Sequence, residues 1–185
     1  MTNTFRKGGI VASILLIALG IGALVIGISG RETVHSDLAR EQIVGTPDSA
    51  IPGQKVDTGA EAKEFAATVR KHTIAATGGK TYSQMDRFLD DSGKPTGDEK
   101  AAALDPKSGQ PVENPARNIW ISSTAFQTAL NTAYFAESVA LFVIVMGAAL
   151  LLIGIGFLVL TLRLLKPEAA PERIVRNAVP AAAAG

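Results

Sequence analysis

The sequence contains no cysteine, only two histidines and few aromatic residues. The absence of cysteine excludes disulfides, thiolate metal sites, a cysteine nucleophile and lipid attachment through sulfur. His72 has no carboxylate or histidine three or four residues away. His35 has only Glu32 three residues before it, which is a weak metal-binding pattern by itself. We therefore expect no catalytic residue, no metal and no cofactor, and we expect that the protein is not an enzyme.

Ionisable residues are absent from two long apolar runs, residues 8–30 and 138–162, which also lack Asn and Gln. As helices, these runs would each reach roughly 35 Å, enough to cross a hydrocarbon core of about 30 Å. An ion path, a proton relay or a haem ligand inside the bilayer would need polar side chains. The sequence thus predicts two transmembrane helices and argues against transport or electron transfer through this chain alone.

Basic residues flank the two runs. Residues 1–7 and 163–185 hold six Lys and Arg against two Glu, a net charge of +4, whereas residues 31–137 hold 12 basic and 15 acidic side chains, a net charge of −3. Basic flanks favour the cytoplasm. We predict a multi-pass protein of the cell (plasma) membrane with both termini cytoplasmic. The predicted parts are a cytoplasmic N-terminus (1–7), a first span (8–30), an extracytoplasmic domain (31–137), a second span (138–162) and a basic, Ala/Pro-rich cytoplasmic tail (163–185).

The first run follows Arg6 and Lys7, as the apolar part of a signal peptide would. However, it exceeds the usual length of about 7 to 15 residues, and its end lacks an Ala-x-Ala-like cleavage site. We expect this run to be retained as a membrane span.

The segment between the runs, residues 31–137, is called the intervening segment below. We predict that it is mostly helical, which makes the protein an all-α membrane protein. A capping pattern at Thr58–Glu61 begins one helix, and Gly78-Gly79 ends it. A second pattern at Thr81–Gln84 begins a short helix with Met85, Phe88 and Leu89 on one side. The residues expected to pack in this domain are Phe65, Val69, Tyr82, Phe88, Trp120 and Phe126.

Two further features complete the intervening segment. Residues 90–115 are rich in Asp, Lys, Gly and Pro, and we predict a long surface loop around a helical turn at 98–104. A third capping pattern at Thr124 predicts a helix that runs through the second span to Leu165, with Trp120 upstream of it as a packing anchor. Glu137, at the outer mouth of the second span, is interpreted as an interfacial carboxylate in water.

Small residues recur every seven positions in both runs. Such spacing is typical of helices whose backbones approach closely in lipid, with a left-handed crossing. It predicts either a tight hairpin of the two spans or a groove for a partner's span, although glycine and alanine are also common in spans generally. The predicted helix-packing face consists of Ser13, Gly20, Ala23, Gly27, Gly30, Ala140, Gly147, Gly154 and Thr161.

Several segments together resemble a known group of proteins. They are the first span, the stretch from Gln42 to Asp48, a helix ending between His72 and Gly79, the stretch from Lys80 to Arg87, and the second span. This order is similar to small two-span actinobacterial membrane proteins of unknown function, which are often labelled as aromatic ring-opening dioxygenases. The resemblance implies an actinobacterial cell membrane. The enzyme label does not carry over, because those dioxygenases are soluble iron enzymes and this chain has no clustered histidines.

Three classes of function remain. The expected one is a non-catalytic accessory or assembly subunit of a larger membrane complex, whose partners are other integral membrane subunits and membrane lipid, or further copies of itself. The second is an envelope sensor or ligand-binding membrane protein, and the third is an enzyme. Nucleic acid is not an expected partner, because the intervening segment is acidic and has no basic stripe.

Overall fold

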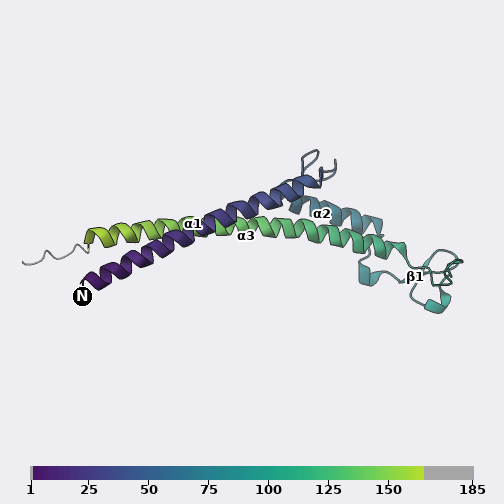
Figure 1. Cartoon of the computed structure of the whole chain (residues 1–185). Helices are drawn as coiled ribbons and strands as arrows, with labels where there is room; N and C mark the ends of the chain where they lie inside the picture. The colour runs from purple at the N-terminus through teal and green to yellow at the C-terminus, as the bar shows by residue number, and fades with distance from the viewer. Residues whose placement is uncertain (1, 165–185) are drawn as a thin grey trace, which may run out of the picture.

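The computed structural model describes residues 2–164 and shows an elongated, mostly helical molecule (Figure 1). Two long helices, α1 (Thr2–Arg40) and α3 (Pro115–Leu164), lie side by side and antiparallel. A shorter helix, α2 (Gly59–Ala76), packs along the part of α3 that precedes the second apolar run. Both long helices are long and apolar enough to cross a membrane. Beyond Leu164, the predicted basic tail lies outside the described residues.

Both long helices extend past the apolar runs. α1 continues through Arg31 to Arg40, and α3 begins at Pro115, so Thr124 lies inside α3 and its prediction as a helix start was wrong. The start is set by Asn114, whose side-chain oxygen accepts a hydrogen bond from the Ala116 N–H at 3.1 Å. Asparagine is a preferred N-cap, and proline suits the first helical position because that N–H has no partner in the helix. Trp120 therefore lies within α3.

The predicted start of α2 is confirmed. The Thr58 hydroxyl accepts from the Glu61 N–H, and the Glu61 carboxylate accepts from the Thr58 N–H at 2.9 Å, which forms a reciprocal capping box. Gly78 and Gly79 follow the helix with positive φ angles of 63° and 80°. One face of α2 joins α1, α3 and the turn before α2 in a single core, which contains Leu38, Ile51, Val56, Ala62, Phe65, Ala66 and Leu130.

The second helix predicted after Thr81 is wrong. The capping box there is present, but it opens only a 3₁₀ turn, η1 (Tyr82–Gln84), and the chain then forms strand β1 (Phe88–Leu89). β1 pairs antiparallel with β2 (Pro95–Thr96), so that Phe88 lies opposite Thr96. A tight turn joins the strands: the Asp90 carboxylate accepts N–H bonds from the turn, and its glycine has a positive φ of 78°. This local bonding competes with a helix and favours a hairpin.

The rest of the 90–115 loop is a second, looser turn. Asp105 accepts backbone hydrogen bonds from the two residues at 107 and 108, and Leu104 forms an isolated bridge to Pro111. The helical turn predicted at 98–104 is shorter than expected: η2 (Glu99–Ala101), capped by the Asp98 carboxylate. These turns gather at the end of α3 that is farthest from the apolar runs, called the distal end below (Figure 1).

Candidate functional site

Small residues of α1 and α3 face each other along the apolar runs. Gly20, Gly27, Gly147 and Gly154 are all buried in the described structure. A Cβ atom added to Gly147 would lie 2.9 Å from the Gly20 carbonyl oxygen, and one added to Gly20 would lie 2.8 Å from the Gly147 carbonyl oxygen. Because these neighbours are backbone atoms, the two helices touch here without intervening side chains. This contact line is called the glycine seam below.

The other predicted seam residues lie around these glycines. A Cβ on Gly27 would lie 3.0 Å from the Ala140 carbonyl, and the Ala23 methyl lies against Gly147. Ser13 is fully buried and donates to the Gly9 carbonyl at 2.7 Å, while Thr161 faces Gly9 from α3. Gly30 is exposed, and its Cβ position is 3.9 Å from the Ala140 methyl. The structure thus brings the predicted face together between α1 and α3, with Gly30 at its margin.

A buried carboxylate lies at the end of the glycine seam. Glu137 of α3 is only 7% exposed, so the interpretation of this side chain as an interfacial carboxylate in water was wrong. One carboxylate oxygen accepts from Arg31 Nε at 2.9 Å and lies 2.7 Å from His35 Nε2, both on α1. The other oxygen accepts the Gly59 N–H at the start of α2. Glu137 therefore joins all three helices at one point.

The environment of Glu137 favours its ionised form. Burial alone would raise the pKa of this carboxyl, but hydrogen bonds from His35, Arg31 and the Gly59 N–H lower the pKa below its usual value. The first residues of α2 add to this effect, because the N-terminus of a helix carries partial positive charge. The cluster is thus a satisfied ionic junction and not an isolated buried charge.

The Glu137 cluster also explains a glycine at the start of α2. A Cβ atom on Gly59 would lie 2.7 Å from Glu137 Oε2 and 2.9 Å from the Tyr134 Cα atom. No larger residue fits between α2 and α3 at this point without a shift of the backbone. Beside it, the Lys63 ammonium lies 4.6 Å from the centre of the Tyr134 ring, a cation–π contact that further connects α2 to α3.

The predicted packing residues divide between two regions. Phe65 is in the three-helix core with Val69 packed against it, and Phe126 meets Phe65 edge to face at 6.2 Å. Trp120 is buried under the Arg70 guanidinium, which lies 5.0 Å from its ring centre. The remaining two, Tyr82 and Phe88, lie at the distal end and not in this core.

The second histidine has a partner that local spacing did not reveal. His72 Nε2 lies 2.8 Å from Asp48, which also pairs with Lys71 at 3.0 Å. Hydrogen bonds from His72, Lys71 and Thr46 hold the pKa of Asp48 well below its usual range. All the charged side chains here are roughly half exposed, so this is a surface contact between α2 and the turn before it. His35 likewise pairs with Glu137 and not with Glu32.

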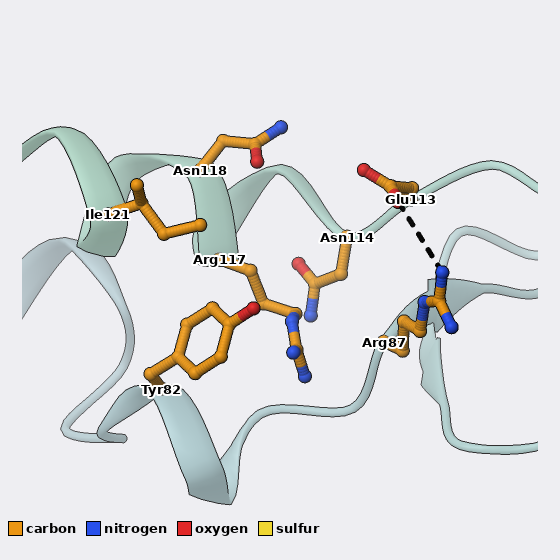
Figure 2. A pocket seen from close by; sticks show the side chains of 7 residues that line it. All are labelled: Tyr82, Arg87, Glu113, Asn114, Arg117, Asn118 and Ile121. Atoms are coloured by element: carbon orange, nitrogen blue, oxygen red, sulfur yellow. Dashed lines mark ion pairs between the residues drawn. The ribbon is translucent and has the colours of Figure 1, made fainter.

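A polar cavity of about 340 Å³ lies at the distal end (Figure 2). Tyr82 comes from η1, Arg87 precedes β1, and Arg117 is in the first turn of α3. Arg117 lies 4.0 Å from the centre of the Tyr82 ring and donates to the Met85 carbonyl at 2.9 Å. The remaining residues that line the cavity are Glu113, Asn114, Asn118 and Ile121.

Within residues 2–164, no three His, Asp or Glu side chains come together as a metal site would require. No protein family model, curated protein or solved structure matches this chain.

Proposed function

We propose that this protein is a non-catalytic accessory or assembly subunit of a larger membrane protein complex. It would lie in the cell membrane of an actinobacterium, with both termini in the cytoplasm and the intervening segment outside. Its partners would be other integral membrane subunits, or further copies of itself, surrounded by membrane lipid. The observation that carries this proposal is the glycine seam, where the backbones of the two spans touch.

Because α1 and α3 are in direct contact along the seam, the spans can contact other molecules only through their outer surfaces. Between Gly20 and Gly147 there is no room for a methyl group, and the apolar runs contain no ionisable side chain. Their large apolar side chains point outward instead: Leu19, Phe142, Val145 and Leu152 are between 62% and 70% exposed. In a bilayer, such a surface contacts lipid or other spans, and it offers no groups for chemistry.

The Glu137 junction supports a structural role, in which the position of the spans is coupled to that of the intervening segment, and not a catalytic role. Its bonds to Arg31 and Gly59 tie the start of α2 to both long helices just beyond the apolar runs. A partner that binds the spans would therefore fix the position of the intervening segment, and the reverse also holds. This is the behaviour expected of a subunit that works by contact.

The partner contacts can be tested with a photo-activated amino acid introduced singly at Phe142, Leu152 or Ile144. Phe142 and Leu152 are exposed, whereas Ile144 lies against Gly27 in the seam. We expect adducts with one defined set of membrane subunits from the two exposed positions, in complexes purified with mild detergent. Ile144 should give mainly adducts within the chain. A chain that migrates alone and forms no protein adduct from Phe142 or Leu152 would contradict the proposal.

The orientation has a separate test, which the absence of cysteine makes clean. Single cysteines at Ser92 and Thr4 should differ in intact cells: a membrane-impermeant maleimide should label only the former. The opposite labelling would refute the proposed topology.

The alternative class, an envelope sensor or ligand-binding membrane protein, is favoured by one observation. The distal cavity is lined mostly by charged and polar side chains, and two of these, Arg87 and Glu113, are more than 60% exposed.

A further inference from the structure

We infer that the distal cavity binds a small zwitterion that carries a carboxylate and an ammonium group, as an α-amino acid does. The cavity contains two guanidinium groups and one carboxylate, from Arg87, Arg117 and Glu113, so its lining has a net charge of +1 (Figure 2). Its volume of about 340 Å³ is at the small end of the range for ligand pockets, roughly 300–1,000 Å³.

The fold places these charges beside each other. Phe88 forms a bridge to Glu113, and the Asn114 N–H donates to the Arg87 carbonyl at 2.8 Å, so the strand carrying Arg87 runs alongside the residues that precede α3. The Arg87 and Glu113 side chains form a long ion pair of 4.0 Å, drawn as a dashed line in Figure 2, and the Arg87 guanidinium also lies 5.0 Å from the centre of the Phe88 ring. Direct charge-assisted bonds between nitrogen and oxygen measure about 2.7–2.9 Å. This pair is longer than a direct bond, and both side chains are more than 60% exposed, so both groups remain able to bond a ligand.

Two uncharged groups around the cavity are exposed to solvent. Within residues 2–164, the Asn118 amide and the Tyr82 hydroxyl form no hydrogen bond with protein, and both residues line the cavity. Asn114, by contrast, is fully used: its amide donates to the Asp86 carbonyl and its oxygen caps α3. The cavity thus combines a fixed polar floor with two polar groups that form no hydrogen bond with protein and one carboxylate held only by a long ion pair to Arg87.

This set of groups selects the class of ligand. Arg87 can donate to a carboxylate, and Glu113 can accept from an ammonium group. A simple anion would leave Glu113 repelling it, whereas a simple cation would meet two guanidinium groups. Ile121 provides the only aliphatic wall, so a small side chain such as a methyl group fits best.

The test uses the full chain in detergent micelles and isothermal titration with L-alanine, acetate and ethylammonium. Alanine should bind, and acetate and ethylammonium should each bind more weakly, because each carries one of the two charged groups. Arg87→Gln should weaken both alanine and acetate about tenfold or more, since it removes a charge-assisted bond. Glu113→Gln should weaken alanine while leaving acetate equal or tighter.

Matched controls separate binding from folding. Arg87 and Glu113 are more than 60% exposed, so their substitution should leave the melting temperature unchanged. Arg40→Gln and Glu99→Gln remove the same charges elsewhere on the surface and should not alter binding. A folded protein whose affinity for alanine is weaker than about 1 mM, or whose affinity ignores both cavity variants, would overturn the inference. Binding is independent of assembly, so a seam variant that loses its partners should still bind alanine.

Discussion

The glycine seam predicts a sharp difference between glycines of the same helix. Gly147 and Gly156 both lie in α3, but only Gly147 faces α1. A Cβ atom on Gly147 would meet the Gly20 carbonyl oxygen and the Leu24 nitrogen, both at 2.9 Å. A Cβ on Gly156 would meet nothing within 4 Å. We expect Gly147→Ala to weaken the α1–α3 pair and Gly156→Ala to leave it unchanged.

The magnitude follows from the distances at Gly147. Carbon atoms in contact prefer separations of about 3.5–4.0 Å, so the helices must part by roughly 0.5–1 Å to admit one methyl group. Overpacking of this kind typically costs about 1–3 kcal/mol. That range corresponds to roughly a 5- to 150-fold shift toward the separated helices. Gly147→Leu should cost more, because its side chain would enter the same backbone contact.

The measurement needs a reporter of the distance between the helix ends. Cysteines at Thr4 and Leu164, labelled with a donor and an acceptor dye, lie at the end of the hairpin where α1 begins and α3 finishes (Figure 1). Titration of dodecyl maltoside micelles with sodium dodecyl sulfate should separate the helices of Gly147→Ala at a lower mole fraction than those of Gly156→Ala. Equal midpoints for the two variants would show that the seam does not depend on backbone contact.

Four further changes test the junction and the core. Because the pKa of Glu137 is lowered, its ionised form should stabilise the fold above about pH 4.5. This contribution should disappear as the pH falls through the lowered pKa. Melting temperatures at pH 7 and pH 4 should therefore differ less in Glu137→Gln than in the wild type. Gly59→Ala should lower the melting temperature by forcing α2 from Glu137, whereas Gly22→Ala, which meets no atom within 4 Å, should not. His35→Ala should lower the melting temperature and His72→Ala should hardly change it, because only His35 contacts a buried partner; equal effects would contradict the assignment. Trp120→Ala should cost about 3–5 kcal/mol in unfolding experiments, while Phe135→Ala, 67% exposed, should cost far less.

Several features of the fold could be predicted from the sequence because they depend on local chemistry. The two apolar runs are long enough to span a bilayer whatever the rest of the chain does. The capping box at Thr58 is complete within four residues, so its bonds form wherever that helix lies. Gly20 and Gly27 are seven residues apart, as are Gly147 and Gly154, and this spacing places each pair on one side of its own helix.

Other predictions were wrong because two local signals in the sequence competed. The pattern after Thr81 favours a helix, but the turn centred on Asp90 and Gly93 closes a hairpin that takes Phe88 and Leu89 into a strand. Thr124 likewise resembles a cap, but the Asn114-Pro115 pair upstream starts the helix earlier, and nothing between them stops it. At both places, the sequence contains a signal for the observed structure next to a pattern that favours a different one.

The Glu137 junction shows where a signal of longer range was available. Its partners lie 78, 102 and 106 residues away, so no local pattern contains it. However, Glu137 lies on one side of α3 in a row of residues spaced seven apart, together with Leu130, Ile144 and Leu151. None of these is fully exposed. Arg31 occupies the equivalent place on α1, in a line with Leu24 and Leu38.

An ionisable residue within an apolar line is costly unless an opposite charge meets it. Glu137 is the acidic residue in the apolar row of α3, and Arg31 is the basic residue in the apolar row of α1. Both lie where the two apolar runs meet the intervening segment, so the sequence predicts that they pair. The same argument fixes the register of the antiparallel pair: a shift of one helix by seven residues would separate Glu137 from Arg31 and would leave the buried Glu137 carboxylate without its guanidinium partner. The ion pair thus specifies the alignment that the glycine seam, which repeats every seven residues, leaves open.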